Sequence, residues 1–257
     1  MRTKVFAGRV ARDILRDPLN LLFGLGFPLV VLLLLTAIQS HVPVELFALP
    51  RLTPGITVFG LSFLTLFSAT LVARDRESAF LQRLYTTPMR AHEFILGYLL
   101  PLLPMALAQG AVCYLAAVIA GLAPSLNMLY ALSGLLLVSL FFIALGLLCG
   151  SVFGIKQVGG LCGALLTNLT AWLSGTWFDL ELVGGVFRRA ANLLPFVHAV
   201  EMERALLAGD FAGVLPHIGW VLGYAAAAAA AAAEEAKRKE EEEAKKPKEP
   251  TEVELLQ

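Results

Sequence analysis

The chain has 257 residues, of which 58% are hydrophobic and 16% are charged, and its mean hydropathy is +0.74. Soluble domains are about half apolar and about a quarter charged, so this composition excludes an ordinary soluble domain. The formal net charge is zero, but the basic residues are spread unevenly, so their positions are more informative than their sum. The apolar residues lie in long blocks, and a helix of about 20 such residues crosses a bilayer. We therefore predict an all-α polytopic membrane protein with six transmembrane helices.

Residues 1–18 interleave arginine and lysine with apolar side chains. This pattern predicts a basic amphipathic helix that lies in the membrane interface, with its charges toward the lipid headgroups. The first span is predicted from Leu19 to Ile38, and the second from Gly55 to Ala73. Residues 74–92 are too polar to enter the bilayer, and their apolar positions recur at helical spacing. A short amphipathic helix is therefore expected in this loop.

Four further spans are predicted, and they are Phe94 to Leu122, Met128 to Phe153, Val158 to Ser174 and Gly213 to Ala233. Residues 175–212 lie between the last two spans and are too polar to cross the bilayer but too apolar for a solvated loop. We expect them to form a re-entrant outer segment of short helices. The transmembrane domain is then residues 19–233.

The last span contains nine consecutive alanines, Ala225 to Ala233, which differ from the Leu, Val and Phe of the other spans. Alanine favours a helix but favours lipid only weakly. The charged tail 234–257 follows. We interpret the tract and the tail as an engineered extension or placeholder sequence, and the alternative is a native charged cytoplasmic helix. The functional prediction therefore rests on the residues before Ala225.

The distribution of Lys and Arg predicts the orientation. With six spans, residues 1–18, 74–92, 154–157 and the tail share one side of the membrane and hold 16 of the 20 basic residues. Cytoplasmic loops carry such an excess. Both termini are therefore expected in the cytoplasm, and the chain in the bacterial inner membrane.

The sequence has no glycine-rich phosphate-binding loop, no metal-ligand spacing among its four histidines and no hydrolase motif. The spans also lack the chains of acidic residues that a proton-driven carrier uses. No catalytic residue, metal or cofactor is therefore predicted in this chain, and nucleic acid is not an expected partner. The energy source is expected to lie in another polypeptide.

Residues 73–97 read ARDRESAFLQRLYTTPMRAHEFILG. This stretch resembles the charged loop between spans two and three of the ABC-2 family of transporter permeases. This chain has Ser78 and Ala79 where the family usually has Gly-Thr. The resemblance implies a coupling helix that docks on a separate nucleotide-binding ATPase subunit. The residues expected to make this contact are Arg76, Glu77, Leu81, Arg83, Leu84 and Tyr85.

A second stretch fits the same family. A small-residue turn ends in Trp177 and Phe178, and it is followed by NLLPFVHAVE at 192–201 and by Arg204. In the family this segment shapes the outer mouth of the transport path. Trp177 and Phe178 suit the headgroup region of the membrane. His198 and Glu201 are three residues apart on a predicted helix, a spacing that allows them to form a hydrogen-bonded pair in a structural role.

Few polar side chains lie within the predicted spans. Candidates for the substrate path are Asn168, Gln109 and Thr170. Polar groups at such positions usually hold helices together, which is the alternative role. Asn168 and Gln109 cost the most when exposed to lipid, so both are expected to face protein.

The resemblance implies a permease subunit of an ATP-binding cassette exporter that works as a homodimer or related heterodimer. The partner ATPase would bind ATP with Mg²⁺. Short outer loops favour an amphipathic, lipid or lipid-linked substrate that enters from the membrane. Two alternatives belong to other classes of protein. A membrane-embedded enzyme lacks its catalytic groups here. A non-transporting scaffold or sensor subunit, which docks a cytoplasmic partner through 74–92, remains the alternative.

Overall fold

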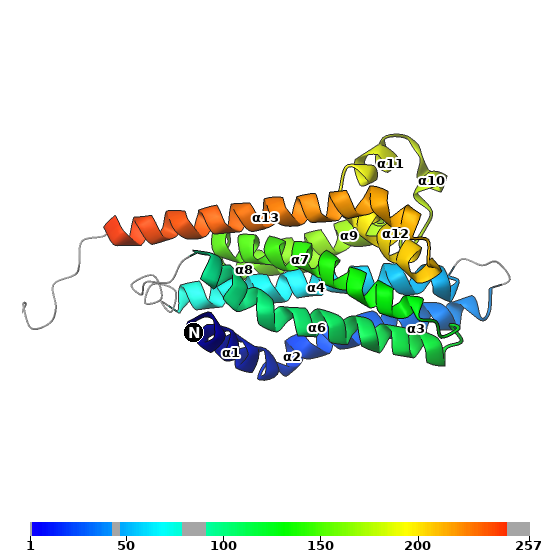
Figure 1. Cartoon of the computed structure of the whole chain (residues 1–257), viewed down its shortest axis with the longest axis horizontal. Helices are drawn as coiled ribbons and strands as arrows, with labels where there is room; N and C mark the ends of the chain where they lie inside the picture. Colours follow the sequence, from blue (N-terminus) through cyan, green and yellow to red (C-terminus); the bar gives the residue numbers. More distant parts are fainter. Residues whose placement is uncertain (1, 43–46, 79–90, 246–257) are drawn as a thin grey trace, which may run out of the picture.

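The computed structural model describes residues 2–42, 47–78 and 91–245, and it contains no strand within those ranges (Figure 1). The elements are α1 (Arg2–Leu15), α2 (Pro18–Leu21), η1 (Leu22–Gly26), α3 (Phe27–Gln39), α4 (Leu49–Glu77), α6 (Ala91–Ile119), α7 (Asn127–Val152), α8 (Ile155–Val158), η2 (Gly159–Leu166), α9 (Thr167–Leu173), α10 (Leu180–Val183), α11 (Gly185–Asn192), α12 (Pro195–Ala208) and α13 (Phe211–Lys245). The two η elements are π-helical. The all-α prediction is confirmed for the described residues.

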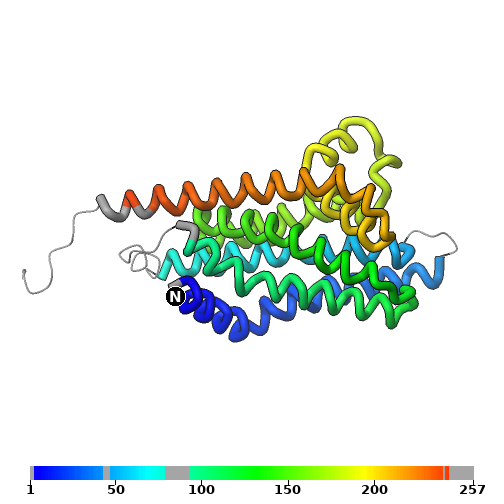
Figure 2. The backbone as a smooth tube through the Cα atoms, in the orientation of Figure 1, coloured from blue at the N-terminus to red at the C-terminus, as the bar shows by residue number. Residues whose placement is uncertain are grey.

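Five helices in the described part of the chain are long and apolar enough to cross a membrane, and they lie side by side along the long axis of the molecule (Figures 1 and 2). Their bounds are Pro18–Gln39, Leu49–Glu77, Glu93–Ile119, Asn127–Val152 and Phe211–Lys239. They correspond to the first four predicted spans and to the sixth. The helix α4 continues through the charged residues 74–77, because these side chains find partners on neighbouring elements instead of ending the helix.

The predicted fifth span is not among these five helices. Its residues form α8, η2 and α9, which follow one another without a gap. The segment contains Gly159, Gly160 and Gly163, and glycine weakens a regular α-helix because it gains no packing and loses more backbone entropy. The wider π-helical turns of η2 coincide with this glycine-rich stretch.

The core of the bundle is the contact between α4 and α7. Of the five long helices, α4 is the most buried. Glycines on α7 let the two helices approach closely, because a Cβ atom at Gly146 would lie 2.6 Å from the backbone carbonyl oxygen of Thr65. The Thr65 hydroxyl donates a hydrogen bond of 2.8 Å to the carbonyl oxygen of Phe142, so the contact is polar as well as close.

The amphipathic helix predicted at the N-terminus is present as α1. Its buried side chains Phe6, Val10 and Ile14 lie one helical turn apart and form a single face. This face packs on α6, where the Phe6 ring lies 4.9 Å from Tyr98 and 6.3 Å from Phe94 between ring centroids. The apolar face therefore contacts protein, while Val5 and Leu15 remain exposed on other sides of the helix.

The segment 175–212 forms the short helices α10, α11 and α12 at the end of the bundle opposite α1 (Figure 1). We name the two ends of the molecule the α1 end and the α12 end. The turn from α10 into α11 uses Gly184 and Gly185 with φ of 62° and 57°, a left-handed conformation that glycine adopts without strain. α10 and α11 project away from the bundle, whereas α12 packs on α4, α7 and α13.

The last helix, α13, runs without interruption past the predicted end at Ala233 to Lys245. Ala225, Ala228, Ala232 and Ala236 are buried and lie on one face at helical spacing. α13 packs closely against α7, as expected for small side chains that allow backbones to approach. The helix returns to the α1 end of the molecule (Figure 2).

Replacing Gly146 with alanine should loosen the core. The added Cβ would collide with the Thr65 backbone, so Gly146→Ala is expected to lower the free energy of unfolding by about 2 kcal/mol, as overpacked cores do. Thermal unfolding of the detergent-solubilised protein measures the change. Gly223→Ala is the matched control, because no atom lies within 4 Å of a Cβ atom at this helical glycine. Equal melting temperatures for the two variants would contradict close α4–α7 packing.

Candidate functional site

A buried polar cluster joins three helices at the α1 end. The Asp75 carboxylate on α4 accepts two hydrogen bonds from the Arg9 guanidinium of α1, at 2.7 and 3.2 Å. It accepts a third, of 2.6 Å, from the Tyr98 hydroxyl of α6. Asp75 is only 7% exposed, and an ionised carboxylate at such a position needs this number of donors. We call these three residues the Asp75 cluster.

The electrostatics of the Asp75 cluster favour the charged pair. Burial alone would lower the pKa of Arg9, but the hydrogen bond to Asp75 and its negative charge raise that pKa above its ordinary value. Arg9 also lies 3.4 Å from the more exposed carboxylate of Asp13 on its own helix. Beside the cluster, Arg74 lies 3.6 Å from Asp17, the residue that caps α2. Charge pairs therefore fix α1 and α2 to the end of α4.

Arg76 and Glu77, two residues predicted to couple to an ATPase, contact the junction between α7 and α8. The Arg76 guanidinium donates to the carbonyl oxygens of Ser151 and, at 2.7 Å, of Phe153. The Glu77 carboxylate accepts a 3.0 Å hydrogen bond from the backbone N–H of Ile155, the first residue of α8. Both side chains thus bind α7 and α8 to the end of α4.

The other four predicted coupling residues, Leu81, Arg83, Leu84 and Tyr85, lie outside the described residues. The helices that flank residues 79–90 are described. α4 ends at Glu77 and α6 begins at Ala91, both at the α1 end. Residues 79–90 therefore connect two helices whose ends are anchored by the Asp75 cluster. The assignment of these four residues to a coupling contact stays a prediction.

The three candidate path residues lie in different surroundings. Gln109 is buried, and its amide donates a 3.2 Å hydrogen bond to the carbonyl oxygen of Thr57, so it faces protein as predicted. Thr170 is also buried and bonds the carbonyl oxygen of Leu166 within its own helix. Asn168 is exposed, and its amide bonds Ala164 on its own helix at 2.8 Å. The prediction that Asn168 faces protein is wrong for the single chain.

Sequence reasoning placed His198 and Glu201 together, but they do not pair. The His198 ring lies 2.9 Å from the His217 ring, between Nδ1 atoms, and its Nε2 lies 2.9 Å from the Asn192 carbonyl oxygen. Glu201 instead accepts a 2.6 Å hydrogen bond from Arg204. The arginine competes successfully because it offers a full positive charge at the same helical spacing.

The aromatic residues of the turn at 174–178 pack on protein. Trp177 makes an edge contact with Phe59 of α4, with centroids 5.5 Å apart. Phe178 lies 6.2 Å from Phe187 of α11. These contacts hold the turn onto the bundle and onto α11. A place in the headgroup region stays a prediction.

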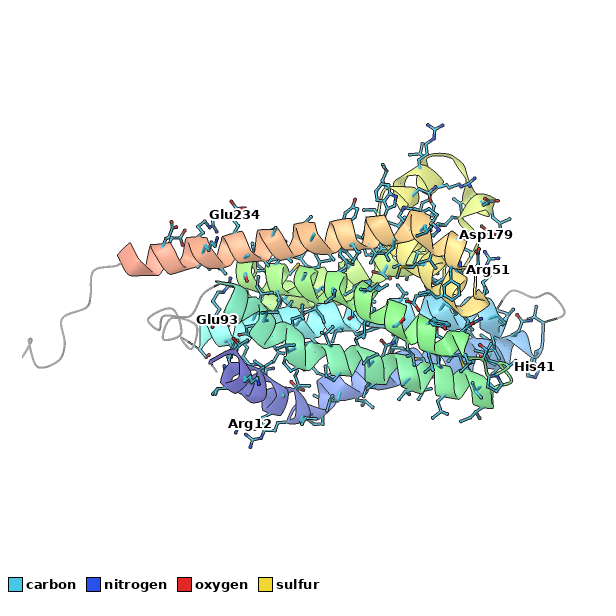
Figure 3. All side chains as sticks on the ribbon, in the orientation of Figure 1. Arg12, His41, Arg51, Glu93, Asp179 and Glu234 are labelled. Carbon is cyan, nitrogen blue, oxygen red and sulfur yellow. The ribbon has the colours of Figure 1, made fainter. Side chains whose placement is uncertain are left out.

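The α12 end holds a polar network that the sequence patterns did not reveal. Arg51, in the first turn of α4, pairs with Asp179 at 3.0 Å (Figure 3). Arg204 bonds the carbonyl oxygens of Arg51 at 3.2 Å and Gly175 at 2.9 Å. The backbone N–H of Glu181 and the charge of Arg51 lower the pKa of Asp179. These groups line a pocket of about 260 Å³ that is rich in paired charges.

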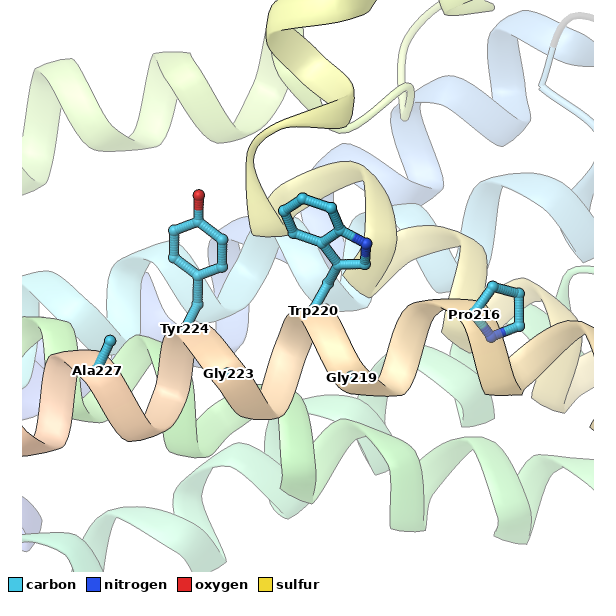
Figure 4. A pocket seen from close by; sticks show the side chains of 6 residues that line it. All are labelled: Pro216, Gly219, Trp220, Gly223, Tyr224 and Ala227. Atoms are coloured by element: carbon cyan, nitrogen blue, oxygen red, sulfur yellow. The ribbon is translucent and has the colours of Figure 1, made fainter.

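A second pocket, of about 500 Å³, opens along one face of α13. Figure 4 shows Trp220 and Tyr224 standing on this face, with Gly219 and Gly223 leaving the helix surface bare beside them. The Trp220 ring stacks on His198 with centroids 4.7 Å apart, and the Tyr224 hydroxyl donates to the Leu193 carbonyl oxygen at 2.6 Å. The pocket is therefore apolar along the helix and bounded by aromatic rings.

The described residues contain no group of three or more His, Cys, Asp or Glu side chains arranged to hold a metal ion. The structure is a helical bundle with charged contacts around Asp75 at the α1 end and the short helices α10, α11 and α12 at the other end. The family model described as ABC-2 type transporter matches residues 1–207. The chain belongs to the ABC-2 type transporter family. This membership agrees with the resemblance found in the sequence and makes the chain a transmembrane transport component.

Two relatives of known name resemble this ABC-2 chain over about the same length. Nodulation protein J of Rhizobium leguminosarum bv. trifolii is 25% identical over 206 residues, which cover 80% of this chain and 77% of the relative. Nodulation protein J of Sinorhizobium fredii (strain NBRC 101917 / NGR234) is 26% identical over 208 residues, 79% of this chain and 76% of the relative. No solved structure matches the chain significantly.

Removing the charge of Asp75 should release α1 from the bundle of this ABC-2 permease. Asp75→Asn weakens two charge-assisted hydrogen bonds to Arg9, so we expect a loss of about 2 kcal/mol in stability. Amide hydrogen exchange should also become faster in α1. Asp13→Asn is the matched control, since it removes an exposed carboxylate that contacts the same arginine. Unchanged exchange in Asp75→Asn would show that the apolar face alone holds α1.

Proposed function

We propose that the chain is the permease subunit of an ATP-binding cassette exporter that moves an amphipathic, lipid or lipid-linked substrate out of the cytoplasm. Family membership carries this proposal, because ABC transporters pair such membrane subunits with an ATPase. ATP and Mg²⁺ would bind to that separate subunit. The ATPase would dock at the α1 end through residues 74–92, which connect α4 to α6.

The arrangement of charged anchors supports docking at the α1 end. Arg9, Asp75, Arg76 and Glu77 fasten α1, α6, α7 and α8 to the last turns of α4. A force applied to the loop after α4 would therefore reach several helices together. Rigid-body movement of packed helices is a known way to switch access between the two sides of a membrane.

The proposed topology has six spans and both termini in the cytoplasm of a bacterial inner membrane. The fifth span would be the continuous run of α8, η2 and α9, in which α8 lies at the α1 end and α9 toward the α12 end (Figure 1). Both α1 and the far end of α13 lie at the same end of the bundle, as an even number of spans requires. α10, α11 and α12 would form the re-entrant outer segment.

The exposed amide of Asn168 supports pairing with a second permease copy. On the surface of η2 and α9, Leu165, Asn168 and Trp172 are exposed along one face. A polar amide facing lipid is costly, and a matching amide on a second copy would satisfy it. In a two-fold symmetric dimer the same residue meets itself near the axis.

This dimer is tested with Asn168→Cys in native membranes. Oxidation should join two copies through this position, and electrophoresis without reductant should show a doubled mass. The exposed control position is Leu215→Cys on α13, which lies outside the proposed contact and should stay monomeric. Equal cross-linking at the two positions would exclude a specific interface at Asn168.

The ATPase contact is tested by placing charges on the predicted coupling residues. The double substitution Leu84→Asp and Tyr85→Asp removes the proposed apolar anchor, and a buried anchor of this kind commonly contributes more than 2 kcal/mol to an interface. We expect the ATPase subunit to be lost from mild detergent pull-downs while the permease still elutes as a folded species. A scaffold that docks a different protein would instead lose that protein, and the co-purified chains identify which outcome holds.

A further inference from the structure

Glu203 of α12 is a fully buried acid with no partner. Its side chain is 0% exposed, and neither carboxylate oxygen has a hydrogen-bond partner among the described residues. An ionised carboxylate in such a place would lose its hydration without compensation, which costs several kcal/mol. This residue is separate from the Asp75 cluster and from the charged pocket at the α12 end.

The packing around Glu203 leaves room for its carboxyl group. A Cβ atom at Gly134 of α7 would lie 2.7 Å from the Glu203 Oε1 atom, so the glycine provides the space for the carboxyl group. The buried Tyr114 side chain of α6 lies near the Glu203 carboxyl.

No positive charge compensates Glu203 within the described residues. Tyr114 is the titratable group beside it on α6, and α7 presents Gly134. On α12 itself, the nearest charged residues are Glu201 and Arg204, which pair with each other at 2.6 Å and line the pocket beside Arg51. Burial therefore opposes the ionisation of the Glu203 carboxyl.

We propose that Glu203 is a proton-binding site, whose carboxyl carries a proton while α12 is packed against α7 and gives it up only when α12 moves away and water enters. The ligand is a single proton. The neutral acid fits an apolar cavity, and the carboxylate does not. The position of α12 is thereby linked to pH through a residue that the transport proposal does not use.

The linkage has a defined sign. Burial raises the pKa of Glu203 well above its ordinary value of 4.5. A group whose folded-state pKa is raised contributes stability at low pH, and this stability is lost as pH rises from 4.5 toward the folded-state pKa. Across that window the unfolding equilibrium constant of the native protein should rise about tenfold for each pH unit relative to a variant without the carboxyl group.

Infrared difference spectroscopy of the full chain in detergent tests the proposal. It detects a protonated carboxyl group directly, so no reagent has to reach the buried site. At about pH 7 the ordinary carboxyl groups of the chain are ionised, so a protonated-carboxyl stretching band identifies a raised pKa. We expect this band in the native protein and its loss in Glu203→Gln. Glu201→Gln is the matched control two residues away, and it should leave the band unchanged. Absence of the band, or its persistence in Glu203→Gln, would overturn the proposal.

Thermal unfolding as a function of pH provides the second measurement. Glu203→Gln keeps the size and neutrality of the protonated acid, so it should fold and should be more stable than the native protein above pH 4.5, by a margin that grows with pH. A variant whose stability follows the native pH profile would show that Glu203 binds no additional proton on folding. This result would contradict a proton-binding role.

Discussion

The close approach of α4 and α7 is the contact on which the rest of the bundle depends. Membrane helices gain little from the hydrophobic effect between themselves, so they associate through backbone proximity and internal polar contacts. Gly146 supplies the proximity, and the bond from Thr65 to the Phe142 carbonyl supplies a polar contact. With α4 held in the centre, α6, α12 and α13 pack around the pair.

The central helix also joins the two ends of the molecule. At the α1 end it presents Asp75, Arg76 and Glu77, which bind α1, α6, α7 and α8. At the α12 end α4 begins near Arg51. This residue bonds the turn before α10 through Asp179, and its carbonyl oxygen accepts a hydrogen bond from Arg204 of α12. In the account proposed above, a displacement that an ATPase imposes after Glu77 would reach the outer segment along a single rigid element.

Much of the fold could be predicted from the sequence, because long apolar blocks have few alternatives in a membrane. The first four spans and the sixth agree with observed helices. The run from Val158 to Ser174 was harder, since its glycines and polar residues weaken the regular helical pattern. The relation of α1 to α6 was also not predictable, because an amphipathic face can meet either lipid or protein.

The contacts of the site residues were less predictable than the spans, because they depend on tertiary structure. Arg9 and Asp75 are 66 positions apart, and Arg51 and Asp179 are 128 positions apart, so no local pattern links them. Glu201 ends the stretch 192–201 that resembles the family, whereas Glu203 lies outside that stretch. Two residues apart on a helix, they face nearly opposite sides, and only the packing reveals that one side is open to a pocket and the other is closed.

The central claim, that an ATPase docks at the α1 end, is tested most directly by site-specific photo-cross-linking in native membranes. A photoreactive amino acid is placed at Ser78, which is exposed at the end of α4, and in a second protein at Leu182, which is 84% exposed on α10. The account predicts a cross-link from Ser78 to an ATPase subunit and none from Leu182. A cross-link to that subunit from Leu182, or its absence at Ser78, would contradict the account.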